Sequence, residues 1–381
     1  MSPRLAGNGL ANRCAMWHQA LAGMGSVTAV VAPVAGPVAP GSDEIVVVPS
    51  DERCSTIPRL AQGLTVERGC ALAEQIGEAA DGVDLVVAIR SYTALLGVGL
   101  REATGARLVV DLDDDDASFF RSIGDEDEAV RFEQLVDSLR HSADLAVSTQ
   151  GFAGTRAVPN SVHVPETPPA TPPGARRVLF KGNMGYEPNA VGARWLIESV
   201  RPLVLECIPD TELIIAGPGS ECFAPFGCGY VADLGALLAG AGVAVAPILH
   251  GSGTRIKILD AWAHGRAVVS TTVGADGLGA VDGVHLLLAD DAMSFAAAVL
   301  RVLEDADLAA ALGAAGRELV TTRYSRQHVV ADTQDTLRST SFATPARTTD
   351  SCRELVAGRR KTGATSVSLN PHPDERQGRY A

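Results

Sequence analysis

Aromatic residues are scarce in this chain. Phe, Trp and Tyr make up only 4% of its 381 residues, although 46% are hydrophobic. Alanine, valine, leucine and glycine must therefore fill the core, and such small side chains suit a layered α/β fold in which helices lie close against a sheet. The length exceeds what one small core needs, so we expect two domains.

Positive charge is also in deficit. The 32 Lys and Arg residues are outnumbered by 45 Asp and Glu, which gives a formal net charge of −13. A protein that binds nucleic acid normally presents a basic face to the phosphate backbone, so we expect no nucleic-acid partner. A local basic pocket for a nucleotide diphosphate stays compatible with this total, because such a pocket depends on nearby charges.

The chain lacks a disulfide framework and an unbroken apolar run. Its seven cysteines are scattered and odd in number, which indicates reduced thiols in a cytosol, and Cys222 and Cys228 have no further ligands at metal-binding spacing. Residues 14–42 carry no charge, but three prolines interrupt them. A membrane-spanning helix needs about 20 consecutive apolar residues. We therefore expect a cytoplasmic protein with no metal and at most peripheral membrane contact.

Apolar runs alternate with helical patterns in two series. The predicted strands are Val27–Ala32, Ile45–Val48, Asp84–Ile89, Leu108–Leu112 and Leu145–Ser148 in the first series, and Val178–Phe180, Glu212–Ala216, Gly229–Val231, Val243–Pro247, Ala267–Thr271 and His285–Leu288 in the second. Buried strands that alternate with helices indicate parallel sheets covered on both faces. Ligands of such sheets bind at the carboxyl ends of the strands, so we expect the chemistry in a cleft at those ends.

Composition places the boundaries. We predict a first domain at residues 1–164, a proline-rich linker at 165–174, a second domain at 175–324, a helix at 325–340 that crosses back to the first domain, and a disordered tail at 341–381. The linker, PETPPATPPG, contains five prolines and no helical pattern. The tail is polar and poor in bulky apolar residues, which is typical of disordered segments.

The segment Val245–Val273 reads VAPILHGSGTRIKILDAWAHGRAVVSTTV and concentrates the chemistry. A strand ends at Pro247, a glycine loop follows, and a helix begins near Thr254. The N–H groups and dipole at a helix start favour a phosphate. Arg255 and Lys257 add cations there.

Asp260 lies one turn after Ile256, where its carboxylate can accept hydrogen bonds from ribose hydroxyls. The alternative interpretation of the whole segment is a capped amphipathic helix with solvated charges.

This segment resembles the donor-binding helix of the group 1 (family 4) glycosyltransferases, which continues with an EAMA…G.PVV.T run. Asp260–Thr271 (DAWAHGRAVVST) follows that run, and Leu179–Asn189 (LFKGNMGYEPN) is similar to the first strand of the family's donor domain and its loop. Gly274–Leu278 (GADGL), Asp282–Gly283 and Tyr324–Ser325 also match. The chain is identified on these residues as a member of the family.

The resemblance implies a GT-B fold, in which two Rossmann-like domains with parallel sheets face each other across a cleft. It implies an acceptor-side domain at 1–164 and a nucleotide-sugar-binding domain at 175–324. A sugar would move from a nucleotide-diphosphate sugar to a glycan, lipid-linked or small-molecule acceptor, with retained configuration and without a metal or other cofactor. The resemblance also implies a role in the synthesis of a surface polysaccharide or glycoconjugate.

The predicted donor site combines two loops and a helix start. Its residues are Gly182, Asn183, Gly251, Ser252, Gly253, Thr254, Arg255, Lys257 and Asp260, with Lys181 as a further candidate. Small residues directly after a strand let the backbone approach a ligand. The family often has two glutamates eight residues apart around this loop, and Ser252 and Asp260 stand in those places here, which leaves the donor's identity open.

In the first half, Gly7, Gly9 and Arg13 resemble the family's acceptor-side glycine loop, although only six residues precede it. Asp113 follows a buried strand in the run DLDDDD, where relatives often carry a histidine near the donor sugar. It is our candidate catalytic residue, and a solvated acidic loop is the alternative. Asp115 and Asp116 fit the start of a helix.

Two other functions remain open. Asp111 and Asp113 also resemble the nucleophile strand of haloacid dehalogenase-type phosphatases, with Asp290 and Asp291 as a metal pair, but Asp115 stands where those enzymes expect Thr or Val. Ser252 stands in the place of the family's first glutamate, and only a short strand could precede the glycine loop at Gly7. Both features would also fit a catalytically inactive GT-B partner protein that binds a nucleotide sugar.

Overall fold

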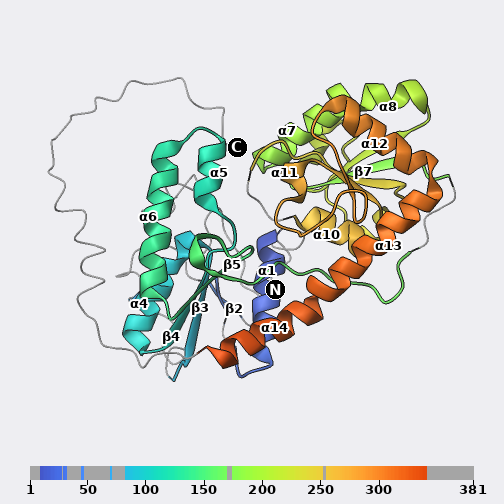
Figure 1. Cartoon of the computed structure of the whole chain (residues 1–381). Coiled ribbons are helices and arrows are strands. Elements are labelled where there is room, and N and C mark those ends of the chain that lie inside the picture. Colours follow the sequence, from blue (N-terminus) through green and yellow to red (C-terminus); the bar gives the residue numbers. More distant parts are fainter. Residues whose placement is uncertain are drawn as a thin grey trace, which may run out of the picture. The chain divides into compact units, whose positions relative to one another are not determined.

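The computed structural model describes residues 9–27, 29–31, 44–46, 69–70, 82–169, 174–251 and 255–340. The chain divides into two compact units (Figure 1). Unit 1 comprises Met1–Val27, Asp114–Asp125 and Val158–Ser339, and unit 2 comprises Thr28–Asp113, Glu126–Ala157 and Thr340–Ala381. Within the described residues, no helix is both long and apolar enough to cross a membrane. The predicted tail at 341–381 lies outside the described residues.

All the described strands of unit 2 pair in parallel. Its four-stranded sheet has the order β3-β4-β5-β6, and a separate pair joins β1 and β2. The strands are β1 (Ala29–Val31), β2 (Glu44–Val46), β3 (Leu85–Ile89), β4 (Arg107–Asp111), β5 (Leu145–Ser148) and β6 (Arg156–Ala157). The helices include α4 (Ala94–Thr104) and α6 (Glu126–Ser142), and Leu108, Val110 and Leu139 are buried together between helix and sheet.

Unit 1 contains a five-stranded parallel sheet of order β11-β10-β9-β7-β8. The strands are β7 (Arg177–Lys181), β8 (Glu212–Ala216), β9 (Val243–Ala246), β10 (Val268–Ser270) and β11 (Leu287–Leu288). The chain starts in the middle with β7, adds β8 on one side and then returns to β9 on the other. This reversal places a topological switch between β7 and β9, and ligands bind outside the carboxyl ends of the strands at such a point.

Helices cover both faces of this sheet because alternate strand residues point to opposite sides. Phe180, Val245 and Val269 pack on one side with helices α7, α8 and α12, whereas Leu179, Ala244 and Val268 pack on the other with α9, α10 and α13. The unit's helices are α1 (Gly9–Ala22), α5 (Asp116–Ser122), α7 (Glu187–Trp195), α8 (Arg201–Cys207), α9 (Leu234–Ala239), α10 (Ile256–Ala263), α11 (Thr272–Ala275), α12 (Ala292–Glu304), α13 (Ala306–Arg323) and α14 (Arg326–Ser339). The prediction of an α/β fold with two parallel sheets is confirmed.

The last helix packs against the first (Figure 1). The Gln334 side chain in α14 donates a hydrogen bond to the Ala20 carbonyl oxygen in α1 at 2.9 Å. Arg326 at the start of α14 donates to Ser161 Oγ at 2.7 Å and also bonds the Asn12 side chain of α1. α1 and α14 therefore lie in the same unit.

Two arginines, Arg266 and Arg317, form hydrogen bonds with residues 165–169 of the proline-rich segment. Arg317 donates to the carbonyl oxygens of Pro165 and Glu166, the latter at 3.2 Å, and Arg266 donates to that of Pro169. Arg266 is 2% exposed, and burial lowers the pKa of its guanidinium. The carbonyl groups of residues 165, 166 and 169 are thus bonded to arginines of the same unit.

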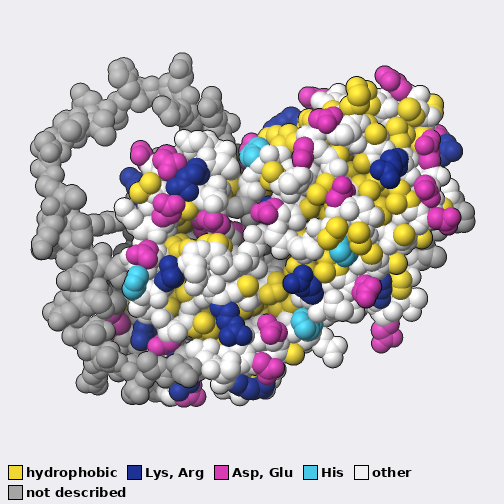
Figure 2. All heavy atoms as spheres, viewed as in Figure 1, with side chains coloured by type: hydrophobic (Ala, Val, Ile, Leu, Met, Phe, Trp, Pro, Cys, Tyr) yellow, Lys and Arg dark blue, Asp and Glu magenta, His cyan; other side chains and the backbone are white. Residues whose placement is uncertain are grey.

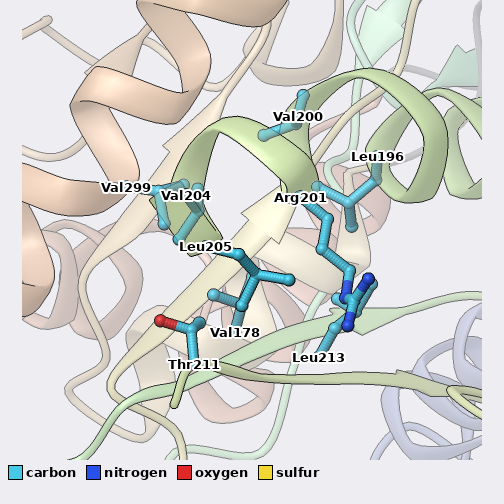
Figure 3. Close-up of a pocket in the computed structure, with 9 residues that line it drawn as sticks. All are labelled: Val178, Leu196, Val200, Arg201, Val204, Leu205, Thr211, Leu213 and Val299. Carbon is cyan, nitrogen blue, oxygen red and sulfur yellow. The ribbon is translucent and has the colours of Figure 1, made fainter. Parts of the chain in front are cut away.

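A small apolar cavity lies in the core of unit 1, where α7 continues through a π-helical turn into α8 (Figure 3). Its volume is about 20 Å³. It is lined by Val178, Leu196, Val200, Arg201, Val204, Leu205, Thr211, Leu213 and Val299. The void has little more than the volume that one water needs, and its lining is almost entirely apolar, so we treat it as a packing defect of the core.

Candidate functional site

The candidate site lies at the switch point of the unit 1 sheet. Strand β7 ends at Lys181 and continues into the loop of residues 182–186, and β9 is followed by a loop that reaches Gly251. Gly251 has φ +104, and a Cβ there would lie 3.0 Å from both Pro188 Cγ and Tyr186 Oη. Only glycine fits this backbone and this space without strain. The two loops therefore pack closely together.

Loop 182–186 is also fastened to the loop after β8. The N–H of Gly182 donates to the Ala216 carbonyl at 2.9 Å, and the N–H of Met184 donates to that of Pro218 at 2.8 Å. A Cβ on Gly217 would lie only 2.0 Å from the Gly182 carbonyl oxygen. The glycines permit this close approach, which gives the loop a defined backbone before any ligand arrives.

Three cations gather beside this loop. Arg255 precedes α10 and is 7% exposed, and Lys257 lies in the first turn of that helix. Burial lowers the pKa of Arg255, while Asp276 acts in the opposite direction. Burial, followed by repulsion from Arg255 and Lys181, lowers the pKa of Lys257 to about 7. Three cations therefore lie close together at this point, with Lys181 paired to Asp260 and Asp276 near Arg255.

Side-chain contacts fix the two lysines. Lys257 Nζ donates a hydrogen bond to Asn189 Oδ1 at 2.8 Å and lies 5.7 Å from the centroid of the Phe180 ring. Lys181 forms an ion pair with Asp260, whose side chain is 14% exposed. The helix start thus presents Arg255 and Lys257 next to the loop that follows β7. Such a grouping can bind an anion with more than one negative charge.

The structure brings together six of the nine predicted donor-binding residues: Gly182, Asn183, Gly251, Arg255, Lys257 and Asp260. Ser252, Gly253 and Thr254 lie outside the described residues. Asp260, predicted to contact a ribose, is paired with Lys181. Its contact with a ribose stays a prediction.

The predicted acceptor-side residues have other surroundings. Gly7 lies outside the described residues, and Gly9 is the first residue of α1. Arg13 is 1% exposed, and its guanidinium donates to the Val158 carbonyl oxygen at 2.9 Å and to Asn160 Oδ1 at 3.4 Å. Arg13 thus joins α1 to the segment at 158–160. Its role in acceptor binding stays a prediction.

Asp113 lies in unit 2, directly after β4. Asp113 is 3% exposed and has φ +60. Its Oδ2 forms an ion pair with Arg90 Nη1 at 3.0 Å. Arg90, after the neighbouring strand β3, has φ +83. Such backbone conformations cost energy in residues other than glycine and are common at functional sites. The observation keeps Asp113 as a candidate catalytic residue and adds Arg90, which the sequence analysis missed.

Asp115, Asp290 and Asp291 accept hydrogen bonds at the starts of helices. Asp115 Oδ1 accepts from the Ser118 N–H at 2.9 Å at the start of α5. Asp290 accepts from the N–H and Oγ1 of Thr272, both at 2.7 Å, and Asp291 caps α12. Among the residues that the structure describes, no group of three or more His, Cys, Asp or Glu could hold a metal. Asp291 is thus the N-cap of α12, as Asp115 is of α5, and Asp290 bonds the first residue of α11.

Several site residues were missed by sequence reasoning. Tyr186, Glu187 and Asn189 belong to the LFKGNMGYEPN segment but were not singled out. Asn189 contacts Lys257, Tyr186 lies against Gly251, and Glu187 Oε2 is hydrogen-bonded to His250 Nε2 at 2.7 Å. The available signal was their place in the first turn of the helix that follows the glycine loop. The contacts of Asn189 with Lys257 and of Glu187 with His250 span more than 60 residues, so no local pattern identifies them.

Residues 175–305 match the family model described as Glycosyl transferases group 1. A curated relative, an uncharacterized 44.6 kDa protein in the cps region of Klebsiella pneumoniae, is 30% identical over 135 residues, which cover 31% of this chain and 35% of that protein. The match thus spans about a third of the relative's length.

Two solved structures resemble most of the chain. Sucrose-phosphate synthase from Thermosynechococcus elongatus has a TM-score of 0.68 and 17% identity, over 87% of this chain and 93% of that chain. HepE from Anabaena, solved with UDP and glucose, has a TM-score of 0.57 and 16% identity, over 78% and 87%. At these identities the likeness establishes the fold. The chain has the GT-B fold, and its residues 175–305 match the Glycosyl transferases group 1 family.

Proposed function

We propose that this protein transfers a sugar from a nucleotide-diphosphate sugar to an acceptor. The observation that carries the proposal is the concentration of Lys181, Arg255 and Lys257 where β7 ends and α10 begins. Burial, followed by repulsion from Arg255 and Lys181, lowers the pKa of Lys257 to about 7. A bound diphosphate would relieve the repulsion among these cations. The family model covers this same region of the chain.

In the proposed mechanism, Arg255 and Lys257 hold the diphosphate and stabilise the negative charge that grows on it as the bond to the sugar breaks. Such an interaction is strongest in the transition state and therefore raises the rate. Because two cations already serve this purpose, the proposal includes metal independence. It also includes retention of configuration, with a leaving-group oxygen taking the acceptor proton.

The comparisons support the substrate classes in general terms. HepE was solved with UDP and glucose, and the Klebsiella relative is encoded in a cps region. We propose a nucleotide-sugar donor and a glycan, lipid-linked or small-molecule acceptor, in the synthesis of a surface polysaccharide or glycoconjugate. Further parts of the proposal are a cytoplasmic location, no nucleic-acid partner and at most peripheral membrane contact. On the face in Figure 2, Lys and Arg are interspersed with Asp and Glu.

The test has two stages. UDP, GDP, ADP and dTDP are titrated into the full chain by calorimetry, and the sugar conjugates of the tightest binder are then incubated with and without candidate glycans, with mass spectrometry of the products. We expect micromolar or tighter binding, slow donor hydrolysis, and transfer when the right acceptor is present. Activity that persists in EDTA supports the metal-independent mechanism, and activity lost in EDTA contradicts it.

A second candidate is an inactive GT-B partner protein that binds a nucleotide sugar. It is favoured by the pairing of Asp260 with Lys181, because that carboxylate stands where the family often has its second glutamate. The same experiment separates the two. Binding without hydrolysis or transfer of any donor supports the partner protein, and turnover excludes it.

A further inference from the structure

Asn189 occupies a central place between the two loops and α10. It is the third residue of α7 and is 5% exposed. A buried amide must find partners for its acceptor oxygen and for its donor nitrogen. Here Oδ1 accepts from Lys257 Nζ and Nδ2 donates to the Asn183 carbonyl oxygen, both at 2.8 Å.

Both partners belong to the predicted donor site. Asn183 in turn uses its Oδ1 to accept the N–H of Gly185 at 2.9 Å, so one chain of hydrogen bonds runs from Lys257 through Asn189 into loop 182–186. The amide also lies against the loop backbone, because a Cβ on Gly182 would be 2.9 Å from Asn189 Nδ2.

The two partners fix the orientation of the amide. Turned over, Asn189 would point its NH₂ group at the Lys257 amino group and its oxygen at the Asn183 carbonyl, so both contacts would become repulsive. Asparagine is suited to this position, since an aspartate offers acceptors only and an alanine offers neither group. A lysine ammonium has three donor hydrogens, so the bond to Asn189 leaves others for a ligand.

We propose that Asn189 is a positioning residue that sets the Lys257 amino group and the backbone of loop 182–186 in one fixed arrangement for the diphosphate of the donor. This inference rests on the proposed function. It deepens that function, because it assigns the preorganisation of the site to a side chain that need not touch the ligand.

The test is a double-mutant cycle in binding, with the tightest of UDP, GDP, ADP and dTDP as the probe. Asn189→Ala is combined with Lys257→Met, and Arg194→Ala on the exposed side of the same helix is the matched control. We expect Asn189→Ala to weaken binding about tenfold in the wild-type background and by less than threefold in the Lys257→Met background, because coupled residues are not additive. Equal factors in both backgrounds overturn the proposal, and Arg194→Ala should bind as the wild type does.

A second variant keeps the test decisive if the cycle cannot be completed. Asn189→Asp places a carboxylate beside Lys257, which should raise the pKa of that lysine. The pH above which the affinity for the probe falls should therefore rise by at least about one unit. An unchanged pH profile overturns the positioning of Lys257. If the wild type binds none of the four diphosphates, the proposed function itself fails. If it binds and Asn189→Asp and Asn189→Ala behave like Arg194→Ala, only the role of Asn189 fails.

Discussion

Single residues decide the electrostatics of the candidate site. The chain as a whole carries −13, yet Arg255 and Lys257 are held close together in partly or fully buried positions beside Lys181. Holding buried cations next to one another costs free energy, which appears here as the lowered pKa of Lys257. Clusters of this kind are more common at binding sites than elsewhere.

The first prediction concerns pH. The free protein has a Lys257 pKa of about 7, and a bound diphosphate would raise it, so binding takes up a proton where the free lysine is neutral. Affinity should be highest below pH 7 and fall by up to about tenfold per pH unit above it. Calorimetry from pH 6 to 9, in buffers of different ionisation enthalpy, measures both effects.

Lys257→Arg is the matched control for that profile, because a guanidinium stays charged throughout this range. It should flatten the fall above pH 7 while retaining binding. A wild-type affinity that does not change with pH would show that Lys257 does not meet the ligand.

The second prediction concerns turnover. Arg255→Ala and Lys257→Ala each remove a charge that the mechanism uses in the transition state, so each should lower kcat by about 10²-fold. Arg194→Ala, exposed on α7, should retain wild-type activity. Steady-state kinetics on folded variants provides the measurement. Full activity in both cationic variants would place the diphosphate elsewhere.

The elements of unit 1 could be predicted well from sequence, because buried strands and amphipathic helices leave local patterns. The strands expected at 178–180, 212–216 and 243–247 correspond to β7, β8 and β9. The strand expected at Gly229–Val231 does not form, although the structure describes these residues. An isolated bridge pairs the nearby Gly227 with Ile215 of β8. Backbone hydrogen bonds join Ile215 to Phe226 and Cys228, and Gly217 to Gly229, but this short pairing does not make a regular strand.

Side-chain pairing across the site could not be predicted in this way. Lys181 and Asp260 are 79 residues apart and Lys257 and Asn189 are 68 apart, so only the packed sheet brings them together. The glycine loop and helix start, in contrast, are local and were found. The sequence therefore indicates which loop and helix start form the candidate site, but not which side chains pair within it.

The third prediction concerns the packing of α10 on α13. Gly316 in α13 lets the fully buried Trp262 ring approach, since a Cβ there would lie 2.2 Å from Trp262 Cδ1. Gly316→Ala should lower the free energy of unfolding by about 1–3 kcal/mol through overpacking. Urea unfolding followed by circular dichroism measures it. Gly25→Ala, which has nothing within 4 Å of its Cβ, is the control and should change stability by less than about 0.5 kcal/mol.

At the scale of the whole molecule, unit 1 joins segments from both ends of the chain. Arg326 of α14 bonds both Ser161 and the α1 residue Asn12, and Val162 forms a bridge with Ser325. The chain therefore returns to its own beginning within one unit. Helix α14 begins at Arg326, and these long-range bonds leave no local pattern in the sequence.

The fourth prediction follows from this junction. Arg326→Ala removes the hydrogen bonds to Ser161 and Asn12 and should lower the free energy of unfolding by about 1–3 kcal/mol. Arg338→Ala near the exposed end of the same helix should have little effect, because its ion pair with Asp335 is exposed. Equal stability of the two variants would show that the junction contributes nothing.

The most direct measurement of the central claim is calorimetric titration of UDP, GDP, ADP and dTDP into the intact protein and into its Arg255→Ala, Lys257→Ala double variant. The account predicts that at least one diphosphate binds the wild type and that the double variant binds it at least about 100-fold more weakly. If no diphosphate binds the folded wild type, or if the double variant binds equally well, the cations around α10 are not a diphosphate site and the account is wrong.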